Sequence, residues 1–140
     1  MPTYYASIGE EKKAEEWVKK FLDLFGENLY LELQVNSLPE QERANKTLID
    51  IAKRLGVKLI ATNDSHYLNP EDRLAHQVLM AIQMKKTLME IQQGGSFKCA
   101  NEGLHFASAE EVWKKFEGKF VGWEEAVKNT LEVAEKTQER

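Results

Sequence analysis

The stretch from Lys58 to Tyr67 constrains the fold of this chain more than any other part of the sequence. It begins with the apolar run Leu59-Ile60-Ala61 and turns polar within three residues, ending in an Asp-x-His motif. A short apolar run that breaks into polar residues is typical of a buried parallel strand that delivers side chains to its carboxyl end. Open α/β sheets and barrels bind their ligands at that edge. The stretch therefore predicts a ligand site where this strand ends.

Asp64 and His66 are the candidate functional residues of that strand. They are two positions apart, so on an extended chain their side chains point to the same side. A carboxylate and an imidazole aimed together can bind a divalent metal, or can act as a base and the group that orients it. The structural alternative is that Asp64 caps the turn that follows and His66 is an ordinary loop histidine.

The rest of the sequence indicates an α/β fold, because segments of helical period alternate with short apolar strands. Short connections between these segments are the signature of crossover units in a parallel sheet. We expect about five helices, strands near 29–34 and 58–63, and near 96–106 a small hairpin or two short extended pieces. The helices are expected at about 10–25, 39–55, 70–82, 108–116 and 123–136. Residues 1–137 are expected to form a single compact unit and residues 138–140 a frayed tail.

Composition narrows the class of function. At 140 residues the chain suits one domain, and its net charge of −4 argues against non-specific nucleic-acid binding by this chain alone. Its single cysteine, Cys99, excludes an internal disulfide framework and fits a reducing cytoplasm. No apolar run reaches membrane-spanning length, so we expect a soluble, cytoplasmic chain without a membrane partner.

Two further residues are candidates for supporting the Asp-x-His pair. The amide of Asn63 could orient Asp64 or His66, or it could simply satisfy the end of the strand. Glu32 lies in an otherwise apolar strand, where a buried carboxylate needs a partner or a metal. The alternative for Glu32 is an exposed face or a structural ion pair.

The remaining histidines and the cysteine are weaker candidates. We expect His76 to be packed or hydrogen-bonded within a helix, and His105 to have a packing role in the hairpin. Cys99 has no nearby helix start or basic cluster that would lower its pKa, so no nucleophile is predicted. A catalytic divalent metal usually needs three or more protein ligands. Since Asp64 and His66 supply two, the chain alone is expected to be catalytically incomplete.

A series of motifs, in order and spacing, resembles one known family. They are Leu31-Glu32-Leu33-Gln34, Leu38-Pro39-Glu40-Gln41, Ala61-Thr62-Asn63-Asp64-Ser65-His66-Tyr67, Pro70-Glu71-Asp72, Ala75-His76-Gln77-Val78-Leu79, Ala81-Ile82-Gln83, Thr87-Leu88 and Asn129-Thr130-Leu131-Glu132-Val133-Ala134. Together they resemble the polymerase and histidinol phosphatase (PHP) domain of bacterial DNA polymerase III alpha subunits. The resemblance extends from about Glu10 to Lys136.

The resemblance implies a distorted, TIM-like barrel of parallel strands and helices with a cluster of divalent metals (zinc, manganese or magnesium) at the carboxyl ends of the strands. Its last two metal ligands correspond to Asp64 and His66, with Asn63 and Glu32 as candidates for the layer behind them. The family's other ligands begin with a His-x-His motif that has no match here. The resemblance therefore implies a half-barrel, the carboxyl-terminal part of the domain. It implies a divalent metal in the intact domain and leaves open whether this part binds one by itself. Asn36 is a further departure, since many relatives carry His-Gly there.

The functions implied by the resemblance fall into two classes. In some relatives the domain is similar to metal-dependent phosphoesterases, and a 3′–5′ proofreading exonuclease activity is attributed to it. In others it has lost its ligands and stabilises the polymerase or docks a separate proofreading subunit. Nucleotidyl transfer and DNA contact belong to other parts of the subunit. A third reading, an independent phosphatase, would need its own His-x-His motif. Because a half-barrel exposes sheet edges and apolar faces, we also expect self-association.

Overall fold

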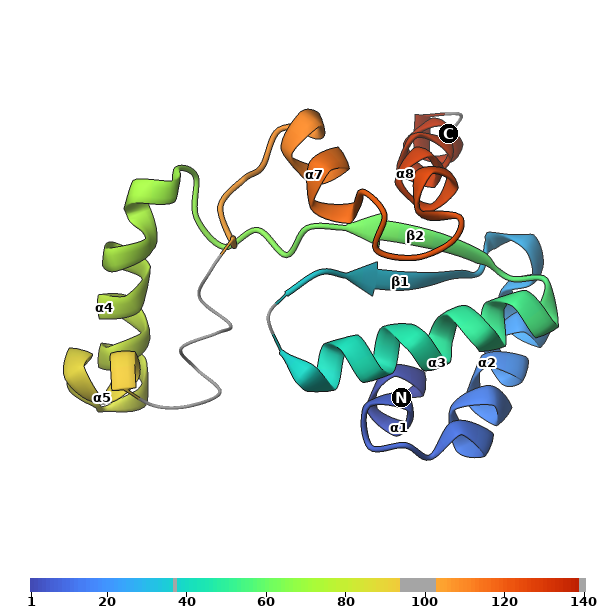
Figure 1. Ribbon diagram of the computed structural model, residues 1–140, viewed down its shortest axis with the longest axis horizontal. Coiled ribbons are helices and arrows are strands. Elements are labelled where there is room, and N and C mark those ends of the chain that lie inside the picture. The colour runs from blue at the N-terminus through green and yellow to red at the C-terminus, as the bar shows by residue number, and fades with distance from the viewer. Residues whose placement is uncertain (37, 94–102, 139–140) are drawn as a thin grey trace.

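The computed structural model describes residues 1–36, 38–93 and 103–138. This part of the chain contains 7 α-helices and a two-stranded parallel sheet, which confirms the α/β class (Figure 1). The elements are α1 (Pro2–Ser7), α2 (Glu11–Phe25), η1 (Gly26–Asn28), β1 (Tyr30–Gln34), α3 (Pro39–Leu55), β2 (Lys58–Thr62), η2 (Pro70–Asp72), α4 (Arg73–Met84), α5 (Leu88–Gln93), α7 (Ala109–Phe116) and α8 (Trp123–Gln138).

The expected number of about five helices is wrong. The short helices α1 and α5 were not predicted, because six-residue segments carry too little periodicity to be recognised and depend on packing for their stability. The five predicted helices are all present, and α8 extends through Gln138. Residues 139–140 lie outside the described residues. A barrel is not established by these elements, so the half-barrel stays a prediction.

Helix α3 connects the two strands and sets their parallel pairing. It begins at Pro39, whose missing N–H costs nothing in the first helical turn, and it ends at Gly56. Gly56 has a φ of +68°, the left-handed conformation that reverses the chain into β2. In the resulting register Leu31 lies opposite Leu59, and Leu33 opposite Ala61. The carboxyl ends of both strands therefore meet at one edge of the sheet.

The core lies on one side of this strand pair. Leu31 and Leu33 of β1 are buried against Leu48 and Ile51 of α3 within one hydrophobic cluster. The same cluster includes Ala6 of α1, Ala14 and Val18 of α2, Phe116 of α7 and Ala126 of α8. Figure 1 shows α3 alongside β1, with α1 and α2 on the far side of α3. Glu32 points to the opposite side and is exposed.

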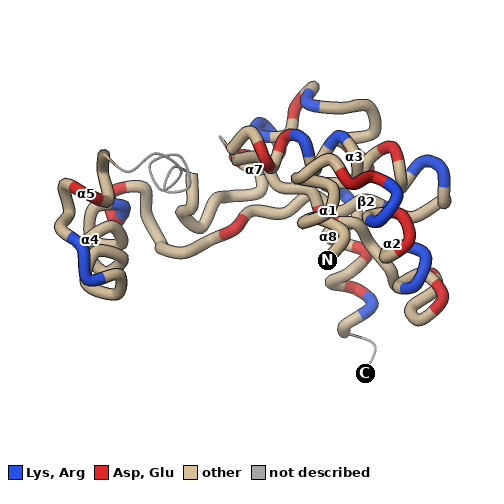
Figure 2. The backbone as a smooth tube through the Cα atoms, turned by 90° about the horizontal axis from the view of Figure 1, so that it is seen from below, with Lys and Arg blue, Asp and Glu red and all other residues tan. Residues whose placement is uncertain are grey.

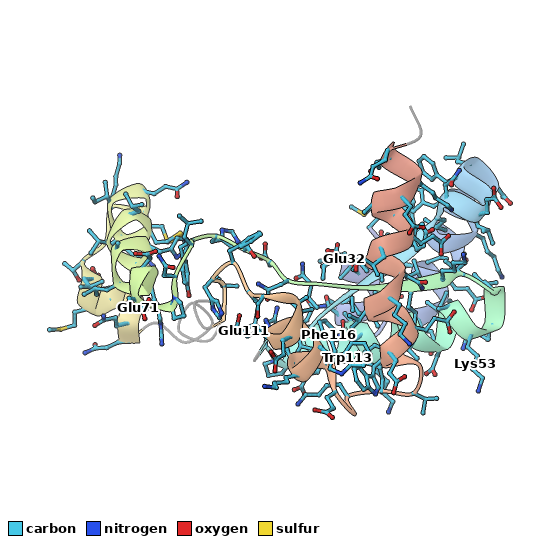
Figure 3. The ribbon with its side chains drawn as sticks, turned by 90° about the horizontal axis from the view of Figure 1, so that it is seen from above. Glu32, Lys53, Glu71, Glu111, Trp113 and Phe116 are labelled. Atoms are coloured by element: carbon cyan, nitrogen blue, oxygen red, sulfur yellow. The ribbon has the colours of Figure 1, made fainter. Side chains whose placement is uncertain are left out.

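Helix α8 packs against β2, the other member of the pair, and crosses over it (Figure 1 and Figure 3). The buried Asn129 donates a hydrogen bond from Nδ2 to the carbonyl oxygen of Leu59 at 2.7 Å. Nearby, Glu132 accepts hydrogen bonds from Tyr30 Oη at 2.7 Å and from Lys58 Nζ at 2.7 Å, and it lies 3.2 Å from Lys136 Nζ. These contacts attach α8 to the amino-terminal ends of both strands.

The segment expected to form a hairpin or two short extended pieces is described from residue 103 onward. His105 forms an isolated parallel bridge with Tyr67, a contact that was not predicted. Its neighbours add backbone hydrogen bonds from His66 N to Leu104 O at 2.7 Å and from Phe106 N to Tyr67 O at 2.8 Å. The other predicted arm, at 96–99, lies outside the described residues, as does Cys99. Residues 104–106 thus hold the extended chain that continues from β2.

Helices α4 and α5 pack on each other and stand apart from the sheet (Figure 1). The chain enters them from the end of β2 and leaves them beyond Gln93. Among the described residues, no helix has the combined length and apolar character needed to cross a lipid bilayer.

The Glu132 network makes the attachment of α8 dependent on pH. Hydrogen bonds from Lys58, Tyr30 and Lys136 lower the pKa of Glu132 from 4.5 to about 2. A carboxylate with a depressed pKa stabilises the fold above its ordinary pKa and loses that contribution as the pH falls toward 2. We therefore expect Glu132→Gln to lower Tm at pH 7, with the difference from the wild-type chain shrinking between about pH 5 and pH 2.

Thermal unfolding followed by circular dichroism at several pH values measures this effect. Glu135→Gln, at an exposed acidic residue of the same helix, is the matched control. A Tm difference for Glu132→Gln that stays constant down to pH 2 would contradict the role assigned to its carboxylate.

Candidate functional site

The end of β2 brings Asp64 and His66 together, as their spacing predicted. His66 Nε2 lies 3.1 Å from Asp64 Oδ2, and both side chains are about half exposed, at 47% and 53%. The polar residues 63–66 that follow Thr62 belong to no helix or strand. The carboxylate and the imidazole converge on one point at the carboxyl end of the sheet.

The separation of these two atoms is compatible with binding one metal ion. Two neighbouring ligands held about 2.0–2.2 Å from a tetrahedral or octahedral ion lie roughly 3.0–3.5 Å apart. The same 3.1 Å also suits a hydrogen bond between imidazole and carboxylate, which preserves the arrangement without a metal. Over residues 1–36, 38–93 and 103–138, no cluster of three or more His, Cys, Asp or Glu side chains forms a metal site. The described residues thus provide two ligands.

Asn63 connects this pair to the rest of the fold through its amide. Its Nδ2 donates to the carbonyl oxygen of His105 at 2.9 Å and to Ser65 Oγ at 3.1 Å. Its Oδ1 accepts a hydrogen bond from Lys115 Nζ at 2.7 Å. The amide therefore fixes the backbone beside Asp64, rather than orienting the carboxylate itself.

Lys115 is a site residue that the sequence analysis missed. It comes from α7, and its ammonium group bridges Asn63 Oδ1 and the carbonyl oxygen of Gly103, at 2.7 and 3.3 Å. Burial lowers the pKa of Lys115, while the negative charge of Asp64 opposes that shift. The side chain thus places a half-buried positive charge behind the Asp-x-His strand. One sequence signal was available, since Lys115 lies three residues after Val112, on the inward side of α7.

His105 and Glu111 are the next residues near the site, and both belong to the segment 103–111. Glu111 closes a capping box by accepting from Ser108 N at 2.7 Å, and its carboxylate also lies 3.4 Å from His105 Nε2 (Figure 3). The Ser108 amide and hydroxyl, followed by His105, lower the pKa of Glu111. The backbone of His105, not its ring, contacts Asn63. The packing role in a hairpin that was expected for His105 stays a prediction, because the other arm of that hairpin lies outside the described residues.

His76 comes from α4 and contacts the His66 ring of the pair. Its ring centroid is 5.5 Å from that of His66 and 5.3 Å from that of Tyr67, in tilted contacts. The prediction that His76 is a packed residue is confirmed. Its Nδ1 is buried without a hydrogen-bond partner among the described residues. His76 therefore packs on the metal-ligand candidate His66 through its ring.

Glu32 and Asn36 have other contacts. The exposed Glu32 accepts hydrogen bonds from Thr62 Oγ1 and, at 3.4 Å, from Gln34 Nε2, across the open face of the sheet (Figure 3). It thus contacts the residue that precedes Asn63. Asn36 Oδ1 accepts from the backbone N–H of Leu38 at 3.2 Å, so this side chain stabilises the turn before α3.

The geometry defines an α/β protein segment with a carboxylate–imidazole pair at the carboxyl end of a parallel strand. Comparison with known proteins relates it to the alpha subunits of DNA polymerase III. The chain is 71% identical over 137 residues to that subunit from Aquifex aeolicus, a match covering 98% of this chain and 12% of the relative. The subunit from Thermus aquaticus is 36% identical over 121 residues, which cover 86% of this chain and 10% of the relative. The subunit from Deinococcus radiodurans is 35% identical over 127 residues, which cover 91% of this chain and 9% of the relative.

The chain is therefore homologous to a segment of DNA polymerase III alpha subunits, and it spans about a tenth of the length of these relatives. No protein-family model matches it. The assignment to a PHP domain accordingly remains a prediction from the motifs.

The role of Lys115 in holding the site can be tested by substitution. Lys115→Met keeps the length of the side chain but leaves Asn63 Oδ1 and Gly103 O without their donor. We expect it to lower the free energy of unfolding by about 1 kcal/mol, and to speed amide exchange at His66, whose N–H bonds to Leu104. Denaturant unfolding and hydrogen-exchange NMR measure the two effects.

Lys114→Met is the matched control, because Lys114 is exposed and pairs only with Glu110 of the same helix among the contacts described. An exposed pair of this kind contributes little, so no change at His66 is expected. Equal exchange rates at His66 in both variants would contradict the positioning role of Lys115.

Proposed function

We propose that this chain functions as part of a replicative polymerase alpha subunit, in which Asp64 and His66 supply two ligands of a PHP-type divalent-metal site. Similarity to alpha subunits along 98% of the chain supports the first half of this proposal. The convergence of His66 Nε2 and Asp64 Oδ2 at 3.1 Å carries the second half. DNA-directed DNA synthesis would be the activity of the whole subunit, with contact to DNA made elsewhere in it.

The proposed chemistry is hydrolysis of a phosphodiester or phosphate ester, including 3′–5′ exonuclease action. A bound zinc, manganese or magnesium ion would activate water and stabilise the leaving oxygen. Asp64 would contribute a negative charge, and His66 a neutral ring nitrogen. Asn63 and Lys115 would keep the strand end in place, with His76 supporting the ring of His66. Since two ligands are too few for a catalytic site, we expect the chain alone to lack this activity.

A second candidate function is a non-catalytic module that stabilises the polymerase or docks a proofreading exonuclease subunit. The exposed apolar side chains of α4 favour it, because such a surface suits protein contact. Asn36 also favours it: the family often has histidine at this position, whereas this side chain caps a turn.

Metal titration distinguishes the two candidates. We expect the chain to bind zinc and manganese in isothermal calorimetry at pH 7, and Asp64→Ala and His66→Ala each to weaken binding by more than about tenfold. Metal affinity falls because each substitution removes one of the two ligands. Asp50→Ala, which removes an exposed carboxylate from α3, is the control and should bind like the wild-type chain.

Equal affinities in the wild-type chain and both ligand variants would show that any binding is non-specific. That result would contradict the metal half-site and favour the non-catalytic module. No binding by the wild-type chain would contradict a half-site that is preorganised without the missing ligands. Circular dichroism of each variant verifies that the fold is retained.

A further inference from the structure

Helix α4 is apolar on two sides, but only one of them is covered. Gln77 and Ala81 are buried on the side that faces α5, where Ile91 is also buried. On another side Leu74, Val78 and Ile82 are exposed by 55%, 40% and 70%. Leu79 beside them is 65% exposed. A helix that is apolar over most of its circumference is normally buried on most of it.

The exposed residues form a continuous row that we call the α4 face, consisting of Leu74, Val78 and Ile82. Their spacing of four residues places them one above another along the helix. Between Arg73 and Lys85 the helix has no charged side chain, so nothing interrupts the row (Figure 2). Because α4 and α5 stand apart from the sheet, the α4 face is also sterically accessible (Figure 1).

Charges of opposite sign flank the α4 face at equal distances. Glu71 lies seven residues before Val78, and Lys85 lies seven residues after it. Glu71 lies in the 3-10 turn η2 that leads into α4, and Lys85 ends the helix with a φ of +54°, so the two charges lie at the two ends of the apolar row. Both residues are exposed, and Figure 3 shows Glu71 at the end of α4. The acidic end, apolar centre and basic end are thus arranged symmetrically about Val78.

We propose that the α4 face binds a second copy of this chain, with the two α4 helices antiparallel and related by a two-fold axis at Val78. In this register Val78 contacts Val78 of the second copy, and Leu74 contacts its Ile82. Glu71 of each copy lies opposite Lys85 of the other, so two opposite-charge pairs flank the apolar contact. An isologous interface requires this self-complementarity. The proposal is independent of the metal half-site.

The charge pattern distinguishes this surface from the other exposed apolar residues. Leu24 on α2 and Leu131 on α8 are 74% and 65% exposed, yet neither has flanking charges placed symmetrically about it on its helix. A parallel arrangement of two α4 helices would place Glu71 near Glu71 and Lys85 near Lys85. Like-charge repulsion disfavours that arrangement.

The first experiment measures molar mass against concentration by sedimentation equilibrium. We expect the chain to approach twice its mass of 16.1 kDa as the concentration rises. Val78→Asp places two carboxylates at the two-fold axis and should weaken the association about a hundredfold. Leu131→Asp makes the same kind of change on α8 and should leave it unchanged.

The second experiment uses charge reversal to test the register. Glu71→Lys alone and Lys85→Glu alone would each create two like-charge contacts, and each should weaken self-association about tenfold. An equimolar mixture of these two variants restores opposite charges at both contacts. It should therefore form a heterodimer as strongly as the wild-type chain forms a homodimer.

Recovery in the mixture cannot come from misfolded variants or from general adhesiveness of apolar surfaces. A monomeric wild-type chain at all concentrations would overturn the proposal and assign the α4 face to a different protein surface. Dimers that Leu131→Asp disrupts and Val78→Asp does not would overturn it as well, as would a mixture that associates no better than the single variants.

Discussion

The parallel pairing of β1 with β2 is the interaction on which the rest of the structure depends. Two strands alone bury little and leave backbone groups unpaired at their edges. Here α3 makes the crossover and covers one side, and α8 supplies Asn129 to a carbonyl of β2. The pairing also fixes where the chain becomes polar after Thr62. The position of the Asp64–His66 pair is therefore a consequence of the strand register.

The part of the fold that the sequence predicted correctly is the part determined by local signals. Helix α3 begins at Pro39 and ends at Gly56 because of backbone preferences that act within one turn of the helix. Strand β2 was recognisable from an apolar run bounded by polar residues. In contrast α1 has six residues, and its buried Ala6 shows that it is held by contacts with distant segments. The parallel contact of His105 with Tyr67 is similarly non-local, and no local sequence signal predicts it.

The residues of the candidate site also fall into those predicted from local spacing and those placed by tertiary packing. Asp64 and His66 are two positions apart on one extended segment, and period two alone predicts that they converge. Lys115 lies on a different helix, α7, whose Phe116 is buried in the core, and this tertiary packing places its ammonium beside Asn63. Glu32 was a candidate because strand β1 looked apolar. In the structure its face of the sheet is open, so its carboxylate bonds to Thr62 at little desolvation cost.

Two incomplete features belong to one stretch, from the end of β2 to α5. The body formed by α1, α2, α3, α7, α8 and the sheet shares one hydrophobic core. The stretch after Thr62 instead presents two metal-ligand candidates where a catalytic site needs at least three. It then presents an apolar row on α4 that its own partner helix leaves exposed. His76 joins the two features, because it lies on α4 and packs its ring on His66. A contact made by α4 would thus bear directly on the orientation of the imidazole at the site.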